Sequence, residues 1–105
     1  MIQEIEPAEL ASARDRDNWA IVDVREDWER DVAQLEGSIN IPLGDLMARI
    51  NEVPRDQNVA VLCHSGMRSA QATQFLNNSG LEAVYNIVGG IDRWSTDVDP
   101  SIARY

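Results

Sequence analysis

Short apolar runs rich in β-branched residues alternate with segments of helical periodicity along the 105-residue chain. This alternation is typical of an α/β fold with a largely parallel sheet. It predicts strands at residues 2–5, 19–24, 37–42, 59–62 and 83–88. It predicts helices at residues 7–14, 27–31, 44–50 and 68–78, and a short helix after the Gly89-Gly90 turn. No repeat, low-complexity tract or linker interrupts the pattern, so we expect a single domain over residues 1–105.

Local signals support several of these boundaries. Pro7 suits the first turn of a helix, and the Asn78-Ser79-Gly80 segment is a glycine-type helix end. Trp28 and Trp94 are assigned to core or edge packing. The polar tail, residues 95–105, is expected to wrap back over the surface.

Composition narrows the possible function classes. The chain has 18 acidic residues against nine basic ones, a net charge of −9, and all nine bases are arginine. The absence of lysine excludes Schiff-base chemistry and a lysine-dependent phosphate loop. No nucleic-acid partner is expected, because phosphate contacts need a basic face. Most acids lie in the first 58 residues, and between Val59 and Leu81 the only formal charge is Arg68.

The cysteine count and the N-terminal residues indicate the cellular compartment in which the protein is expected. A single cysteine rules out an internal disulfide framework and fits reducing conditions. The first residues lack a basic region followed by an apolar stretch, so no signal peptide is expected. No apolar run approaches the roughly 20 residues that a membrane span needs. We therefore expect a cytoplasmic protein with no membrane partner and no cofactor.

The candidate chemistry is concentrated in residues 63–69, Cys-His-Ser-Gly-Met-Arg-Ser, which contain the only cysteine and the only histidine. A predicted strand ends there and a predicted helix begins, so the thiol faces the first amides of a helix. Such amides favour an anion, and a thiolate at this position is nucleophilic. Gly66 permits the tight turn or positive φ of an anion-binding loop, and Arg68 offers two parallel donors to an oxyanion. Ser69 is expected to cap the helix or hold the loop.

Other uses of the cysteine fit the sequence less well. A Cys-His dipeptide supplies two of the usual four metal ligands, so no metal site is expected. A redox dithiol needs a second cysteine. The adjacent Cys63 and His64 rarely reach hydrogen-bonding register, which disfavours a Cys-His protease pair. A buried, inert cysteine is the plain alternative. The glycine and arginine downstream, on a turn that opens a helix, favour an anion-binding nucleophile.

Residues 63–69 resemble the active-site loop of the rhodanese-like sulfurtransferases. The resemblance includes three further elements, in the same order over nearly the whole chain: Val22-Asp23-Val24-Arg25, Gly37-Ser38-Ile39-Asn40-Ile41-Pro42-Leu43 and Gly89-Gly90-Ile91-Asp92-Arg93-Trp94. It implies a three-layer α/β fold with a central, mostly parallel five-stranded sheet flanked by helices. Many family members carry Gly-His-Ile where this chain has Ala33-Gln34-Leu35-Glu36, so a histidine from that loop is missing. The Leu35-Glu36-Gly37-Ser38 form and the chain end look like rhodanese domains fused to adenylating enzymes of sulfur-carrier pathways, although here the domain is expected to stand alone.

The resemblance also implies roles for individual residues. Cys63 is the catalytic residue: its thiolate takes the outer sulfur of a small anionic donor, thiosulfate or a persulfide, and passes it to a thiol or protein acceptor. Asp23 and Arg25 lie on one face of a strand and are expected to support the active loop, with Arg25 pairing with Asp23 or a nearby acid. His64 is either a proton donor or an exposed loop residue. The expected substrate-binding residues are His64, Ser65, Gly66, Met67, Arg68 and Ser69, with Arg68 orienting the donor.

Loop length separates this interpretation from its nearest alternatives. The loop of this chain is Cys-x4-Arg. Phosphatases and arsenate reductases that share the fold have a loop that looks like Cys-x5-Arg, which is one residue longer. A tighter ring of amides fits the terminal sulfur of a persulfide, so the sequence favours sulfur transfer over phosphoryl transfer. Mercaptopyruvate-using relatives end the loop with threonine after a glycine-valine pair, which Met67-Arg68 does not resemble. A non-catalytic binding or regulatory module is the main alternative, and a phosphatase or arsenate reductase is the second.

Overall fold

Five parallel strands form one sheet in the order β1-β5-β4-β2-β3. This computed structural model describes all residues from 1 to 105. The mostly parallel, five-stranded sheet of the sequence prediction is confirmed. The strands are β1 (Gln3–Ile5), β2 (Trp19–Asp23), β3 (Ile39–Asn40), β4 (Asn58–Leu62) and β5 (Val84–Ile87).

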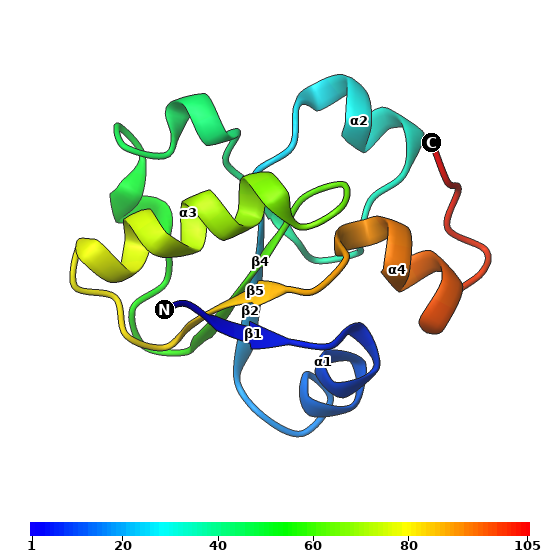
Figure 1. Ribbon diagram of the computed structural model, residues 1–105, viewed down its shortest axis with the longest axis horizontal. Helices are drawn as coiled ribbons and strands as arrows, with labels where there is room; N and C mark the ends of the chain where they lie inside the picture. Colours follow the sequence, from blue (N-terminus) through cyan, green and yellow to red (C-terminus); the bar gives the residue numbers. More distant parts are fainter.

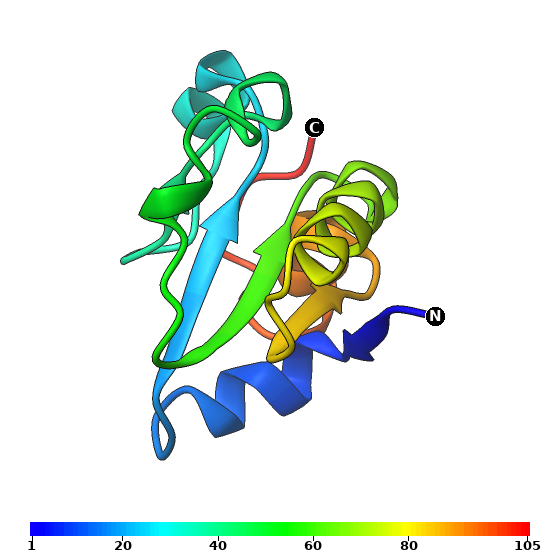
Figure 2. The same ribbon diagram turned by 90° about the vertical axis from the view of Figure 1, so that its left-hand side faces the viewer.

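Helices cover both faces of the sheet and give the three layers (Figures 1 and 2). They are α1 (Pro7–Ala13), α2 (Asp27–Val32), α3 (Met67–Asn78) and α4 (Gly90–Asp97). Side chains alternate along β4, so Val59 and Val61 pack in the core cluster under α3, while Ala60 and Leu62 pack in the cluster under α1 and α4. A central strand that is apolar on both faces is what a sheet covered on both sides requires.

Residues 44–50 do not form the predicted α-helix, and this prediction is wrong. Two short 3-10 helices, η1 (Leu43–Asp45) and η2 (Ile50–Glu52), flank a turn instead. Arg49 leaves the helical region at φ −110° and ψ 19°, and Val53 before Pro54 is extended. With a glycine near its start and a proline-imposed end, the segment is too short to sustain a helix.

Smaller differences concern the edge strand, the tail and one tryptophan. The third strand covers two residues rather than six, because it pairs only with Val22 and Asp23 at the edge of the sheet. Helix α4 continues to Asp97, past the predicted start of the tail. Trp94 is buried as predicted, but Trp28 is 61% exposed, so it is not a core residue and packs only at the surface, edge-on to Tyr105.

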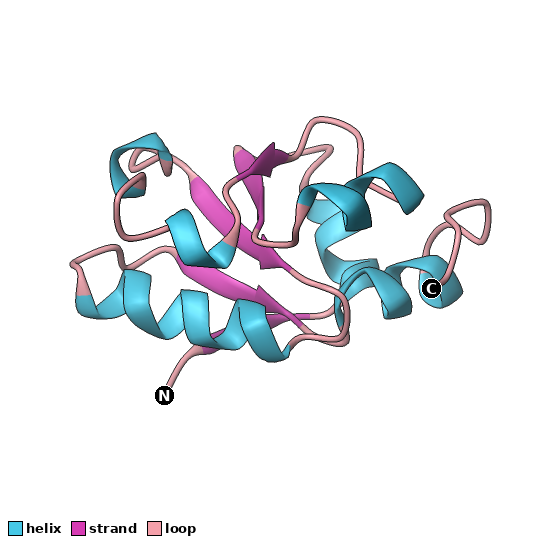
Figure 3. Ribbon diagram, turned by 90° about the horizontal axis from the view of Figure 1, so that it is seen from above, coloured by secondary structure: helices cyan, strands magenta, loops and turns pink.

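The parallel sheet brings the chemistry-bearing segments to one edge. The carboxyl end of β4 leads into residues 63–69, that of β2 into Val24 and Arg25, and that of β5 into Gly89 and Gly90. Seen from above, the loops that follow the strands gather at this edge (Figure 3). Ligands of open parallel sheets bind at this edge, so the fold places the predicted loop where a site is expected. None of the helices combines the length and the apolar character needed to cross a bilayer.

Candidate active site

Cys63 lies directly after β4 and is 1% exposed. The Gly66 amide donates a hydrogen bond to its Sγ at 3.0 Å, and the Ser69 Oγ lies 3.2 Å from the same sulfur. The sulfur therefore contacts one backbone donor and one hydroxyl, both from its own loop. A backbone N–H aimed at a sulfur stabilises negative charge on it.

Gly66 has the positive φ expected of it, at +105°. Other residue types are strained there, and a Cβ would also lie 3.3 Å from the Gly89 amide nitrogen. This turn allows α3 to begin at Met67 without a side-chain cap. The amides of Ser65, Met67 and Arg68 donate to no other backbone group, so they are available at the positive end of α3. Met67 and Ser65 are exposed beside the loop.

Ser69 does not cap α3, contrary to one of the two roles expected of it. Its side chain is fully buried and donates to the Asn86 Oδ1 on β5 while facing the Cys63 sulfur. It holds the loop from inside the core. Asn86 was not among the residues predicted from the sequence, because a single polar residue in a strand carries no local signal of what it contacts.

The Gly89-Gly90 turn fixes the other side of the loop. The amides of Ile91 and Asp92 donate to the carbonyls of Cys63 and His64 at 2.9 and 3.1 Å. Gly90 has φ +61°, and a Cβ there would lie about 2.5 Å from both carbonyl oxygens. The sequence analysis predicted only a turn here. The structure shows a clamp that lets the start of α4 approach the backbone of the active loop.

Arg68 is not free to face a ligand with its full guanidinium group. Its Nη1 and Nη2 donate to the two carboxylate oxygens of Glu29 on α2, at 2.6 and 2.8 Å. Glu29 is 3% exposed, and the hydrogen bonds from Arg68 lower its pKa to about 2, while the same contact raises the pKa of Arg68. The sequence analysis found no carboxylate near Arg68. Glu29 stands 39 positions earlier, so no local spacing could have indicated it.

Asp23 and Arg25 form the predicted pair behind the loop. Both are fully buried, and the Arg25 Nη2 lies 2.8 Å from the Asp23 Oδ2. Arg30 donates to the same carboxylate oxygen at 3.1 Å, and Asn40 donates to the carbonyls of Asp23 and Arg25. Burial by itself would lower the pKa of Arg25, but hydrogen bonds with Asp23 and Tyr105 raise it. The pair connects the end of β2 to α2 and Ala33, while Asn40 connects the backbone of the same segment to the edge strand β3.

The chain end reaches this site. Tyr105 accepts a hydrogen bond from Arg25 at 3.0 Å and donates one to Glu29 at 2.7 Å through its hydroxyl. Its ring stacks on His64 with centroids 4.2 Å apart and meets Trp28 edge-on at 5.9 Å. Burial raises the pKa of Tyr105. Figure 1 shows the terminus beside α2. The tail does wrap back, as predicted, but its contact with the site residues was not foreseen.

The electrostatic character of the site follows from these pairs. Three guanidinium groups, of Arg25, Arg30 and Arg68, face two carboxylates, of Asp23 and Glu29. Most of the positive charge is therefore compensated within the protein. What the loop offers an anion is a set of backbone N–H dipoles and the positive end of α3, with a single partly exposed arginine beside them.

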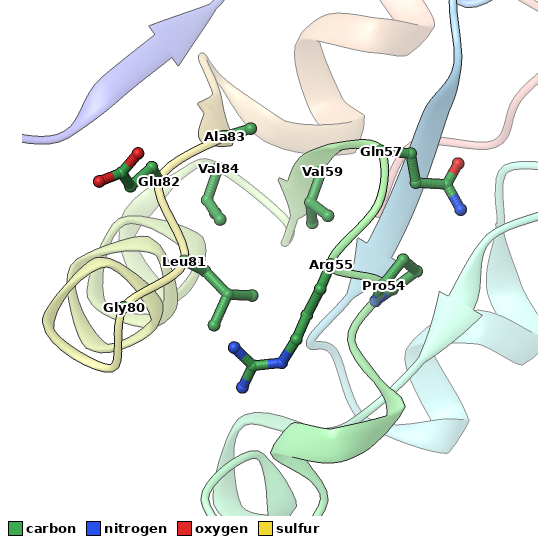
Figure 4. Close-up of a pocket in the computed structure, with 9 residues that line it drawn as sticks. All are labelled: Pro54, Arg55, Gln57, Val59, Gly80, Leu81, Glu82, Ala83 and Val84. Atoms are coloured by element: carbon green, nitrogen blue, oxygen red, sulfur yellow. The ribbon is translucent and has the colours of Figure 1, made fainter.

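A hollow also lies away from this loop. A cavity of about 380 Å³ opens at the amino ends of β4 and β5, beside Val59 and Val84, with Arg55 extending along it (Figure 4). It is at the opposite end of the sheet from Cys63, and both charged side chains on its rim, Arg55 and Glu82, are exposed. No three histidine, cysteine or acidic side chains gather closely enough to hold a metal ion. The candidate site is therefore the loop of residues 63–69.

Comparisons with known proteins agree with this assignment. The sequence matches the rhodanese-like domain family over residues 6–97. It is similar to a sulfurtransferase of Allochromatium vinosum, with 31% identity over 104 residues, 98% of this chain and 97% of that protein. It is also similar to the adenylyltransferase and sulfurtransferase uba4 of Ogataea parapolymorpha, with 34% identity over 86 residues, 81% of this chain and 22% of that protein. A crystal structure of a rhodanese-related protein from Thermoplasma volcanium superposes with a TM-score of 0.87 at 32% identity, over 98% of this chain and 99% of that one. Against four further curated relatives, the chain spans between 23% and 59% of their length.

Proposed function

Because the chain belongs to the rhodanese-like domain family, we propose that it is a sulfurtransferase that carries sulfane sulfur as a persulfide on Cys63. The observation that carries the proposal is the position of Sγ, 3.0 Å from the Gly66 N–H on a loop that opens a helix. A terminal sulfur added to Sγ would extend toward the remaining free amides of the loop. Backbone donors arranged around a developing negative charge are the usual means of stabilising it.

The proposed reaction has two steps. The Cys63 thiolate attacks the outer sulfur of the donor, the donor's S–S bond breaks, and the leaving group departs with the bonding electrons. With thiosulfate the leaving group is sulfite, and a charged terminal sulfur remains on Cys63. A nucleophilic acceptor then attacks this terminal sulfur and releases the Cys63 thiolate. Cyanide serves as acceptor in an assay and becomes thiocyanate, whereas a thiol or a protein is the proposed acceptor in the cell.

Thiosulfate or a persulfide is the proposed donor, and the charges at the site bear on this choice. Arg68 is the proposed contact for an anionic sulfur donor. The contact would use the exposed side of its guanidinium group, because the N–H groups on the other side bind Glu29. The Arg68 side chain is 35% exposed, so a small anion can reach it. The absence of a second cysteine means that the persulfide cannot resolve into an internal disulfide and waits for an external acceptor.

Relatives suggest where the sulfur goes. One similar protein is named an adenylyltransferase and sulfurtransferase, and it is much longer than this chain. We include in the proposal that residues 1–105 form one rhodanese-like domain acting in the cytoplasm, with a protein sulfur carrier as a candidate acceptor. No nucleic acid, membrane or cofactor takes part in this proposal.

Intact-mass spectrometry after incubation with thiosulfate tests the proposal. We expect a gain of one sulfur atom, which is lost when cyanide is added and thiocyanate appears. The variant Cys63→Ser is the matched control and should show no gain and no turnover. Gain from glutathione persulfide but not from thiosulfate would identify an organic persulfide as the donor. No gain from either donor would instead support a non-catalytic binding module.

A further inference from the structure

The side-chain amide of Asn86 has only one orientation that suits its surroundings. Its Nδ2 lies 3.2 Å from a carboxylate oxygen of Glu4 on β1 and 3.3 Å from the carbonyl oxygen of Gly66. Both are acceptors, so the NH₂ group must face them. The Oδ1 therefore faces Ser69, and as an amide oxygen it can only accept. Asn86 is 3% exposed, so water does not replace these partners.

This orientation determines where the Ser69 hydroxyl proton points. A serine hydroxyl has one proton, and Ser69 gives it to the Asn86 Oδ1. At its 3.2 Å contact with the Cys63 sulfur, Ser69 is consequently the acceptor, and the thiol S–H is the donor. The arrangement suits a protonated sulfur. It does not suit a thiolate, which has no proton to give.

We propose that Asn86 is a positioning residue that holds the Ser69 proton away from Cys63 and so opposes formation of the thiolate in the resting protein. When the S–H proton leaves to water, the Ser69 hydroxyl turns from Asn86 to donate to the charged sulfur. The Asn86 Oδ1 then loses its only donor in a buried place, which costs free energy. This role rests on the proposed use of Cys63 as the sulfur carrier.

Charged and titratable groups lie on every element packed around the loop. The test must hold them constant, so it compares the effect of Asn86 with and without the Ser69 hydroxyl. The groups are Glu4 on β1, Asp23 and Arg25 at the end of β2, Glu29 on α2, His64 in the loop, Arg68 on α3, Asp92 on α4 and Tyr105 in the tail.

The first experiment uses the unmodified protein. Cys63 is the only cysteine, so infrared spectroscopy sees a single S–H stretching band. At a pH where the thiol is protonated, we expect the band at a lower frequency than that of a thiol without a hydrogen bond. In Ser69→Ala it should move to the frequency of a free thiol. A wild-type band already at the free-thiol position would overturn the proposal, and this result needs no folded Asn86 variant.

The second experiment is a double-mutant cycle read by the pH dependence of iodoacetamide alkylation of Cys63. Asn86→Leu removes the acceptor at similar volume and frees the Ser69 hydroxyl for the thiolate. We expect the alkylation midpoint to move down by about one pH unit, a roughly tenfold gain in thiolate below the midpoint. In a Ser69→Ala background the same change should move the midpoint much less, and the difference between the two shifts is the effect that passes through Ser69. The loss of the Asn86 contacts with Glu4 and with the Gly66 carbonyl is common to both backgrounds and cancels in that difference.

A matched control separates this role from simple damage to the helix. Thr73 donates a hydrogen bond to the Ser69 carbonyl at 2.7 Å and is fully buried on the same helix. Thr73→Val loses that bond and should keep the wild-type midpoint. An Asn86→Leu shift of equal size with and without the Ser69 hydroxyl, or no shift at all, would overturn the proposal. Gain of sulfur on Cys63 is measured separately, so failure here is distinguishable from failure of the proposed function.

Discussion

Cys63 and Arg68 belong to the same short loop, yet they depend on the rest of the chain in opposite ways. The sulfur contacts Gly66 and Ser69, three and six positions away. The guanidinium contacts Glu29, 39 positions away, and Glu29 in turn contacts Tyr105, 76 positions away. Local spacing therefore builds the environment of the nucleophile, whereas long-range contacts build the environment of the charge beside it.

The surroundings of Cys63 and those of Arg68 also differ in the interactions that hold them together. Around Cys63 the groups are backbone amides and neutral hydroxyls, held by the approach of two glycine turns. Around Arg68 they are ions paired in a largely buried network. Neutral dipoles carry no charge to titrate, whereas an ion pair is lost when the pH is low enough to protonate its carboxylate. Perturbations of these two surroundings should therefore have separable effects on sulfur loading and on stability.

Gly90→Ala should have the largest effect, because it breaks the backbone clamp on the Cys63 side. A Cβ at φ +61° would overlap two carbonyl oxygens of the loop. We expect a loss of about 3 kcal/mol or more in the free energy of unfolding, with loss of sulfur gain on Cys63. Gly80→Ala is the control, since its φ is +97° but no atom lies within 4 Å. It should cost about 1–2 kcal/mol and keep sulfur loading. Equal losses in urea unfolding for both variants would contradict the clamp.

Glu29→Gln should affect mainly the ion pairs around Arg68. It leaves the Arg68 guanidinium without its carboxylate and weakens the Tyr105 contact. We expect the free energy of unfolding to fall by about 2–3 kcal/mol, with persulfide formation on Cys63 retained. Asp97→Asn, which breaks the exposed pair with Arg93, is the control and should leave stability unchanged. If Glu29→Gln abolished sulfur loading in a folded protein, the two surroundings would not be separable.

The pH dependence of stability should carry the signature of Glu29. Its pKa falls from 4.5 to about 2 on folding, because Arg68 stabilises the carboxylate. A carboxyl group with a depressed pKa stabilises the fold at a pH above its unfolded-state pKa. This stabilisation is lost as the pH falls through its folded-state pKa. Urea unfolding between pH 6 and pH 2 should therefore show about 2 kcal/mol more acid destabilisation than in Glu29→Gln. Parallel pH curves for the two proteins would show that the ion pair adds no stability.

Arg68→Ala should have a modest effect on the use of thiosulfate. The Nη1 and Nη2 atoms of Arg68 already donate hydrogen bonds to Glu29, so only the exposed side of the guanidinium group is left to contact the thiosulfate anion. We expect kcat/KM for thiosulfate to fall by about tenfold. Arg93→Ala removes the same formal charge outside the loop and serves as the control. An unchanged kcat/KM in Arg68→Ala would show that its proposed role toward thiosulfate is wrong.

Much of the fold was predictable because burial imposes a period on the sequence. Strand β4 is buried on both faces, so it was predicted from a continuous apolar run. Helix α3 was predicted from the helical spacing of its apolar residues. Residues 44–50 misled the prediction, because helical spacing there is opposed by a glycine and by Val53 before Pro54. Trp28 misled it as well, since an aromatic residue suggests the core but this one lies on the surface against Tyr105.

The sequence by itself indicated the candidate nucleophile, its glycine turn, the parallel sheet and the family, because these follow from residue types and their spacing within short segments. Only the tertiary structure brought Glu29 to Arg68, Asn86 to Ser69 and Tyr105 to His64. These contacts form when strands far apart in the chain end at one edge of the sheet and the tail returns to it. Their charges and hydrogen-bond directions belong to the surroundings of the Cys63 loop, and no spacing along the chain encodes them.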